Sequence, residues 1–252
     1  MSFAVPAEAY DRFMGVHSRQ LSPQLADLAL LSPDARVLDV GCGPGALTTE
    51  LVARLGANAV VAVDPSESFV AAARERHPGV DVRRAAAETL PFADRAFDAA
   101  IAQLVVHFMT DPVAGLREMA RVTRPEGVLA ACVWDYAGER APVSVFWRAS
   151  RDLGLGTDGE SALAGAREGH LVELFKTAGL RQVEQASLVA RVKYASFDDW
   201  WGPITLGVGP AGARYKASSP DDRERLRQRC EELLPPTSFE VVSHAWAARG
   251  IV

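Results

Sequence analysis

Short apolar runs alternate with segments of helical periodicity through the first half of the chain. The apolar runs predict strands at residues 35–40, 59–64, 80–85, 96–104 and 127–134. The segments between them predict helices near residues 46–55, 67–76 and 112–122. Asp111 and Pro112 give the last of these a cap and a favourable first residue. Strands that alternate with helices form βαβ units, so the pattern predicts a parallel sheet.

The alternation changes after Trp134. Helices are predicted at about 143–153 and 170–179, and two long strands at 180–194 and 239–252. The connection between these strands, about residues 195–238, is long and rich in Trp, Pro and Gly, which predicts a lid-like insertion. Leucines at near-helical spacing predict an N-terminal helix over residues 6–31. We expect one domain over residues 1–252, with this helix as a cover.

Composition narrows the class of protein. The 252 residues carry a formal net charge of −5, which gives no basic footprint for nucleic acid. No apolar run approaches the roughly 20 residues that span a membrane, and the N-terminus has no signal-peptide pattern. We therefore expect a cytoplasmic protein. The three cysteines and five histidines show neither disulfide nor metal-ligand spacing, so no metal is predicted.

The segment from Val37 to Thr48, VLDVGCGPGALT, predicts a strand, a glycine-dense turn and a helix start. Such a turn lets bare backbone N–H groups approach a ligand. Gly41, Gly43 and Gly45 form G-x-G-x-G, and with Ala46 they also satisfy the dinucleotide fingerprint. The loop alone therefore indicates a nucleotide-like cofactor without separating NAD(P) from others.

Two acidic residues favour a cationic adenosine cofactor. Asp64 ends the second strand, where a carboxylate can accept hydrogen bonds from both ribose hydroxyls, although a helix-capping role also fits. Asp39 precedes the glycines, where it would repel a pyrophosphate and suit an ammonium or sulfonium group. S-adenosylmethionine (SAM) carries both charges. A buried Asp39 that holds the turn is the alternative.

Four segments of the chain, in this order, resemble class I SAM-dependent methyltransferases: VLDVGCGPG, VAVDPSE, AAAETLPFADRAFDAAIAQLVVHF and REMARVTRPEGVLAACVW. The nearest subgroup is similar to the ubiquinone/menaquinone C-methyltransferases, and the likeness covers about residues 35–135. It implies an α/β, Rossmann-like three-layer sandwich. The sheet would have seven strands in the order 3-2-1-4-5-7-6, mostly parallel with strand 7 antiparallel.

The resemblance also implies a set of cofactor-binding residues. They are Tyr10, Arg19, Asp39, Gly41, Gly43, Asp64, Pro65, Ala87, Glu88, Gln103 and Leu104. Tyr10 and Arg19 belong to the N-terminal cover, and Asp39 would reach the ammonium group through water. Many relatives carry an acidic residue where this chain has Ala86, so a side-chain contact to the adenine amine is expected to be missing.

Methyl transfer from a sulfonium needs alignment of the acceptor atom, and a base only where that atom must lose a proton. His107, expected at the mouth of the active site, is the predicted catalytic residue, because its ordinary pKa lies near neutrality. A pocket or core histidine with no proton role is the alternative. Tyr10, His17 and Asp135 are weaker candidates for the base.

Aromatic residues from the variable parts of the chain are predicted to wall a substrate pocket. They are Trp134, Trp147, Trp200 and Trp201. Ordinary packing of the insertion onto the sheet edge is the alternative for them. The segment from Ser219 to Pro236 predicts a solvated helix, with Leu226, Leu233 and Leu234 as its buried side.

The predicted function is SAM-dependent methylation of an O, N, S or C atom of a small molecule. Two alternatives stay open: a SAM-binding protein with other chemistry, and an NAD(P)-dependent oxidoreductase. The acidic balance disfavours RNA or protein methylation. No membrane partner is expected, and a homodimer is one expectation for the oligomeric state.

Overall fold

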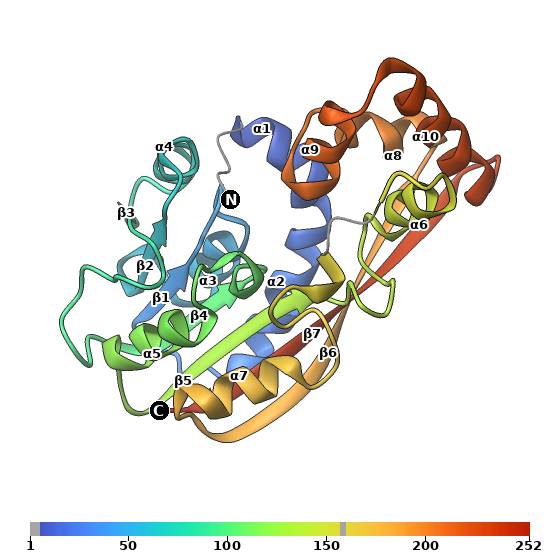
Figure 1. The fold of residues 1–252 in the computed structure, drawn as a ribbon. Helices are drawn as coiled ribbons and strands as arrows, with labels where there is room; N and C mark the ends of the chain where they lie inside the picture. The colour runs from blue at the N-terminus through green and yellow to red at the C-terminus, as the bar shows by residue number, and fades with distance from the viewer. Residues whose placement is uncertain (1–5, 157–159) are drawn as a thin grey trace.

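The computed structural model describes residues 6–156 and 160–252, and a seven-stranded sheet is its centre (Figure 1). The strands are β1 (Val37–Val40), β2 (Val60–Asp64), β3 (Asp81–Arg84), β4 (Phe97–Gln103), β5 (Thr123–Trp134), β6 (Arg181–Tyr194) and β7 (Phe239–Ile251). Their order is β3-β2-β1-β4-β5-β7-β6, with β7 antiparallel to both of its neighbours and the pairs from β3 to β5 parallel. The predicted topology is confirmed.

Helices cover both faces of the sheet (Figure 1). One buried cluster joins α2 (Val16–Ala29), α3 (Ala46–Leu55) and α4 (Glu67–Arg76) to the sheet. A second cluster joins α5 (Pro112–Val122) and α7 (His170–Ala178) to it. Before β6 the chain also forms α1 (Ala7–Tyr10), a π-helical turn η1 (Asp11–Gly15), α6 (Ser144–Asp152), and the short turns η2 (Ala57–Ala59), η3 (Val106–Phe108) and η4 (Glu160–Ala162). The architecture is the predicted three-layer sandwich.

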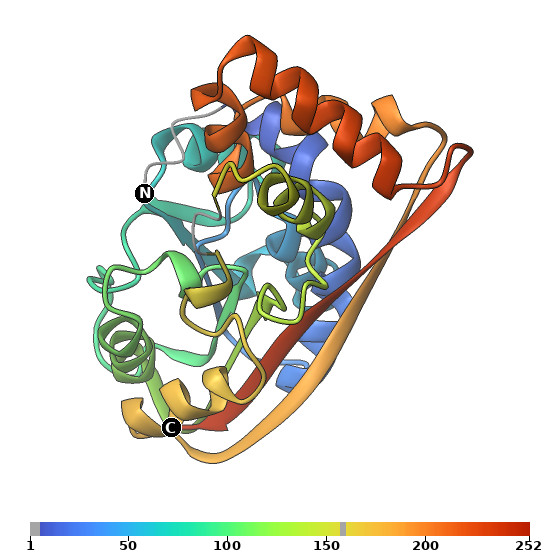
Figure 2. The same cartoon turned by 45° about the vertical axis from the view of Figure 1, so that its right-hand side comes forward.

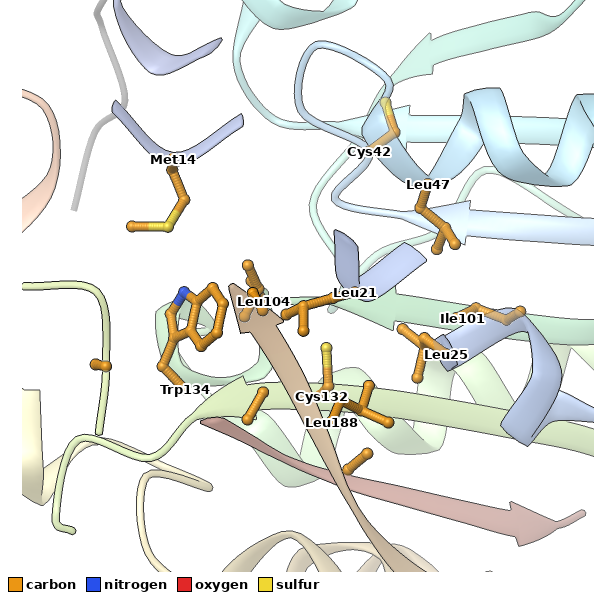
Figure 3. Packing of buried hydrophobic residues seen from close by; sticks show 14 of the residues in the cluster. Met14, Leu21, Leu25, Cys42, Leu47, Ile101, Leu104, Cys132, Trp134 and Leu188 are labelled. Carbon is orange, nitrogen blue, oxygen red and sulfur yellow. The ribbon is translucent and has the colours of Figure 1, made fainter. Parts of the chain in front are cut away.

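The central strands β1, β2 and β4 are buried on both faces, which explains their continuous apolar runs. In β2, Val60 and Ala62 belong to the first cluster, whereas Val61 and Val63 belong to the second. Side chains alternate along a strand, so each face receives every second residue. In Figure 3, Leu21 and Leu25 of α2 lie in the first cluster, together with Leu104 and Ile101.

Local signals set the helix starts. The side chain of Asp111 accepts a hydrogen bond from Ala114 N at 3.0 Å, and Pro112 begins α5, as predicted. Such a cap satisfies one of the amide groups that lack a partner in the first turn. No helix among the described residues has the length and apolar character needed to cross a membrane.

A two-stranded arm extends beyond the main sheet. β5 pairs with β7 only from Ala245 to Ile251, so Phe239–His244 of β7 pairs with β6 alone. Helices α8 (Phe197–Ile204), α9 (Gly209–Ala217) and α10 (Pro220–Leu233) connect the outer ends of this arm (Figures 1 and 2). In α10, Leu226 and Cys230 are fully buried, whereas Leu233 and Leu234 are only half-buried. The buried side therefore includes Cys230, which the sequence analysis did not place there.

The outer edge of β6 pairs with two glutamine side chains of α2. Gln20 donates to Arg191 O and accepts from Arg191 N, both at 2.8 Å. Gln24 donates to Val189 O at 2.8 Å and accepts from Val189 N at 3.0 Å. Each amide thus satisfies one residue of the edge strand as a neighbouring strand would.

Candidate cofactor and active site

A cavity of about 820 Å³ lies at the carboxyl ends of the parallel strands. Its walls come from the loops after β1, β2, β3 and β4, and from α1. In open α/β sheets, ligands bind where the strand order reverses, which here is between β1 and β4. The volume lies within the range of small-molecule sites, about 300–1,000 Å³.

The glycine loop forms the floor of this cavity. Gly41 N and Cys42 N both donate to Val63 O, at 2.8 Å and 2.9 Å, which holds the loop against β2. Gly41 has φ +71°, and a Cβ there would lie 2.4 Å from Val105 Cγ2. Gly43 has φ +54° with nothing within 4 Å of such a Cβ. Packing against Val105 therefore requires a glycine at Gly41, whereas at Gly43 the backbone is open to a ligand.

Asp64 lines the cavity beside this loop. Its Oδ2 accepts from Gly43 N at 2.9 Å, and its Oδ1 accepts from Ser66 N at 2.8 Å. Burial raises the pKa of this carboxyl, and the two backbone bonds oppose that rise. Each carboxylate oxygen accepts about two hydrogen bonds, so capacity remains for the two hydroxyls of a ribose.

Asp39 and Arg19, both predicted to bind the cofactor, do not line the cavity. Asp39 is 1% exposed, and its Oδ2 accepts from Thr48 Oγ1 at 2.6 Å. Burial raises its pKa to about 7. The Arg19 side chain is 54% exposed and lies 3.9 Å from Asp11. Asp39 therefore holds the turn before α3, and any contact with the cofactor's ammonium group must pass through an intermediary.

The other predicted cofactor residues all line the cavity: Tyr10, Gly41, Gly43, Asp64, Pro65, Ala87, Glu88, Gln103 and Leu104. The Glu88 carboxylate accepts from Thr110 N at 2.7 Å, which ties the segment around Ala87 to the start of α5. Ala86, which lacks an acidic side chain, lies on the same wall.

The side chain of Gln103 tests whether the cavity suits SAM. Its Nε2 donates to Ser18 O at 3.1 Å, but its buried Oε1 has no hydrogen-bond partner among the described residues. A buried acceptor without a donor is costly. The ammonium of SAM is a donor, so this acceptor on the cavity wall fits that cofactor. Tyr10 also lines the cavity, with its ring centroid 5.2 Å from that of Phe69.

Residues that line the cavity but that the sequence analysis missed include Phe69, Arg84, Phe108 and Met109. Arg84 ends β3 and pairs in register with Asp64. The rule that ligands lie at strand ends could have found it. Its Nε donates to Pro65 O at 3.1 Å, which fixes the chain after β2. Nothing in the periodicity marks the other three.

A smaller cavity adjoins the first, with which it shares Tyr10, Leu104 and Phe108. We call it the inner cavity. Its lining is Tyr10, Phe13, Met14, Leu104, His107, Phe108, Trp134, Tyr136, Val143, Glu160, Val208, Gly209, Pro210 and Ala211. It therefore lies between η1, the ends of β4 and β5, and the first residues of α9.

His107 lines the inner cavity rather than the mouth of the larger one. It is 5% exposed, and its ring lies 3.8 Å from Phe108 and 5.8 Å from Tyr136, between centroids. Burial lowers its pKa to about 3, so it is neutral and a weak base near pH 7. The expected position at the mouth is wrong, because η3 turns the side chain inward. Its catalytic role stays a prediction.

The weaker base candidates are held by other contacts. His17 Nε2 lies 2.9 Å from Tyr194 Oη, and burial lowers the pKa of His17 to about 4. Asp135 Oδ2 accepts from Arg140 Nε at 2.6 Å. Neither residue lines either cavity. Among the described residues, no group of three or more His, Cys, Asp or Glu could hold a metal ion.

The four predicted pocket tryptophans separate into two pairs. Trp134 lines the inner cavity, and Trp147 Nε1 donates to the Glu160 carboxylate on its wall. Trp200 and Trp201 line neither cavity. They are buried in α8, where their rings pack against Phe197. The alternative of ordinary packing therefore describes Trp200 and Trp201, and the substrate-wall prediction for them is wrong in this geometry.

Known proteins share this sequence pattern. Residues 38–131 match the family model described as "Methyltransferase domain". An uncharacterized methyltransferase of Mycobacterium tuberculosis (strain ATCC 25618 / H37Rv) is 35% identical over 186 residues, which cover 73% of this chain and 70% of that protein. The chain belongs to the SAM-dependent methyltransferase family. This identification confirms SAM as the cofactor predicted from the sequence.

Other methyltransferases match a shorter region. A demethylmenaquinone methyltransferase of Mycobacterium sp. (strain KMS) is 41% identical over 118 residues, or 46% of this chain. The chain spans about half of that relative, 49% of its length. Among solved structures, the [4+2]-cyclase SpnF superposes with a TM-score of 0.59 at 22% identity, over 92% of this chain and 80% of that one. Geranyl diphosphate C-methyltransferase from Streptomyces coelicolor A3(2) superposes with a TM-score of 0.54 at 14% identity, over 92% of this chain and 78% of that one. These two likenesses support the fold alone.

Proposed function

We propose that this methyltransferase transfers the methyl group of SAM to a small-molecule acceptor. The observation that carries the proposal is the cavity at the strand-order reversal, which is lined by Gly43 with its open backbone, by Asp64, and by Gln103, whose buried Oε1 has no hydrogen-bond partner among the described residues. These groups match a ribose and an ammonium group. Tyr10, Leu104 and Phe108 line both this cavity and the inner cavity, so the two adjoin.

SAM supplies a methyl group already activated on a sulfonium, so the chain's own residues have to bind, orient and exclude water. Asp64 and Gln103 fix the two ends of the cofactor through polar contacts. Leu104 and Phe108 lie where the two cavities meet and present apolar side chains there. Such positioning can lower a barrier by about 7–11 kcal/mol.

A small-molecule acceptor is supported by the names of the relatives and by the charge of the chain. Two of them are named demethylmenaquinone methyltransferase and ubiquinone biosynthesis O-methyltransferase. The net charge of −5 offers no general attraction for nucleic acid. We further propose a cytoplasmic protein, with residues 195–238 acting as a lid and a homodimer as the assembly to test first.

Calorimetry tests the cofactor site directly. S-adenosylhomocysteine, the demethylated product, is expected to bind, and NADH is not. Asp64→Ala is expected to weaken this binding by about 1–3 kcal/mol, or about 5- to 150-fold, because buried hydrogen bonds to a ribose are lost. Asp98→Ala is the matched control, since Asp98 also accepts a backbone N–H, from Arg36 at 2.7 Å, but lines neither cavity.

Transfer itself requires a labelled product. SAM carrying an isotopically labelled methyl group, incubated with the protein and candidate acceptors, is expected to yield a labelled small molecule. If SAM binds but keeps its methyl label while an acceptor is converted to another product, the result would support different chemistry on this fold. The superposition with a cyclase illustrates that such chemistry occurs on it. Tight binding of NADH without SAM binding would contradict the proposal.

A further inference from the structure

The inner cavity is small and mostly apolar. Its volume is about 30 Å³, room for about one water molecule or one polar group of an organic molecule. Phe13, Met14, Val143 and Val208 supply much of its surface. The adjoining cavity, at about 820 Å³, is far larger. A molecule held beside the cofactor could therefore extend only a single functional group into the inner cavity.

Two buried ring nitrogens on the inner cavity's lining residues have no hydrogen-bond partner within residues 6–156 and 160–252. They are His107 Nδ1 and Trp134 Nε1. Figure 3 shows the Trp134 nitrogen turned toward Met14, which lines the same cavity. A buried polar group left unpaired costs about 1–3 kcal/mol. The pair therefore indicates a bound group that can satisfy an indole N–H donor and an imidazole nitrogen together.

A carboxylate completes the polar part of the wall. Glu160 is 5% exposed and accepts hydrogen bonds from Trp147 Nε1 and from the Tyr136 hydroxyl. Burial raises its pKa to about 7, so it can exchange a proton near neutral pH. Burial instead lowers the pKa of His107 to about 3, which makes its imidazole a weaker base. Of the two, Glu160 is the better proton acceptor.

We propose, on the basis of the function above, that the inner cavity receives the reacting hydroxyl of an apolar acceptor and that Glu160 accepts its proton. The acceptor oxygen would form a bond to the methyl carbon as the carbon–sulfur bond breaks. The sulfur keeps that electron pair and becomes neutral, and the hydroxyl proton passes to the Glu160 carboxylate, which later releases it to solvent. The reaction class is O-methylation.

A hydroxyl fits these groups better than other nucleophiles. Its oxygen can accept from Trp134 Nε1 while its proton is donated to His107 Nδ1 or to Glu160. An alkyl amine is mostly protonated near neutral pH, and the resulting ammonium group has no lone pair for the indole N–H. A thiol is a weak acceptor. A carbon nucleophile would leave both ring nitrogens unpaired.

Two probes of nearly the same shape test the site in the full chain saturated with S-adenosylhomocysteine. They are p-cresol and p-xylene, which carry a hydroxyl and a methyl group at the same position. Titration calorimetry at pH 8 is expected to show p-cresol binding at least about tenfold more tightly than p-xylene, because only the hydroxyl pairs with the buried groups. Equal affinities, or no binding of p-cresol, would overturn the proposal.

Single substitutions test which side chain causes the preference for p-cresol. Trp134→Phe is expected to reduce the p-cresol preference at least about threefold, since it removes the indole donor. Trp246→Phe is the matched control, because Trp246 Nε1 is also buried without a partner among the described residues but lines neither cavity. A preference that survives Trp134→Phe, or that falls equally in both variants, would contradict the assignment.

The pH dependence of p-cresol binding tests Glu160. An ionised carboxylate is the stronger acceptor, so the affinity is expected to rise several-fold from pH 5 to pH 8 and to stay flat in Glu160→Gln. The other titratable groups on the wall do not change charge in this interval: the pKa of His107 is about 3, that of Tyr10 about 12, and that of Tyr136 well above its ordinary value. A rise that persists in Glu160→Gln would refute the role of Glu160. If the natural chain does not bind S-adenosylhomocysteine, the result would instead contradict the proposed function.

Discussion

Replacement of Gly41 by alanine separates the packing role of the glycine loop from its backbone conformation. At φ +71°, a side chain costs about 1–2 kcal/mol in backbone strain. The added Cβ would also lie 2.4 Å and 2.7 Å from the two Cγ atoms of Val105, an overpacking that typically costs about 1–3 kcal/mol. Gly41→Ala is therefore expected to reduce the free energy of unfolding by about 2–5 kcal/mol.

Gly43 provides the matched comparison. Its φ of +54° gives a similar strain, but a Cβ there meets nothing within 4 Å. Gly43→Ala is expected to cost only about 1–2 kcal/mol. Urea denaturation followed by circular dichroism would measure both variants, with the slope of the transition checked for two-state behaviour.

A double-mutant cycle identifies the clash. Val105→Ala removes both Cγ atoms, so Gly41→Ala should cost at least about 1 kcal/mol less in the Val105→Ala background than in the natural chain. The relief would be incomplete, because Val105 Cβ remains 3.2 Å from the added atom. Equal destabilisation by Gly41→Ala and Gly43→Ala, or an absence of coupling with Val105, would refute this reasoning.

Further predictions concern stability. Burial raises the pKa of Asp39 and Glu160 to about 7, from ordinary values of 3.8 and 4.5, so the folded protein holds these protons more tightly than the unfolded chain. The contribution of these two carboxyls to stability should therefore fall as pH rises from about 4.5 to 7, by up to about 1.4 kcal/mol per pH unit per group. His17 and His107, whose pKa burial lowers to about 4 and about 3, contribute the opposite slope below about pH 6.5, so the carboxyl contribution is the difference between the natural chain and its variants. Urea denaturation between pH 5 and pH 8 would show this, and a slope unchanged in both Asp39→Asn and Glu160→Gln would contradict it. Asp111→Ala should cost about 1 kcal/mol by removing the hydrogen bond to Ala114 N, and a melting temperature identical to that of the natural chain would argue against the cap.

The strands of the parallel part of the sheet were predictable because the information is local and repeated. Each buried parallel strand appears as an apolar run, and the position of Asp64 at the end of one run and of Gly41 after another marks the carboxyl edge. The resemblance to a family supplied the order of all seven strands, which periodicity alone does not give. Of the helices between the last two strands, the 14-residue α10 was predicted, whereas α8 and α9, of 8 and 9 residues, were not.

The cofactor site was predicted better than the acceptor site for a physical reason. Cofactor contacts use backbone and strand ends, whose places follow from the topology. The inner cavity instead depends on side-chain directions set by turns, as with His107 on η3, and on residues distant in sequence, as with Glu160. Asp39 illustrates the same limit, since its identity suggested a ligand whereas its contact is Thr48.

The glutamine pairing on β6 has a consequence for self-association. An open edge strand offers unpaired amides to another chain, which can extend the sheet across molecules. Here Gln20 and Gln24 occupy the amide and carbonyl groups of Arg191 and Val189, so this part of the edge cannot accept a foreign strand without first losing four hydrogen bonds. The opposite edge, β3, is only four residues long and mostly charged. Addition of a strand from a second copy of this chain is therefore disfavoured at Val189 and Arg191 of β6 and at β3.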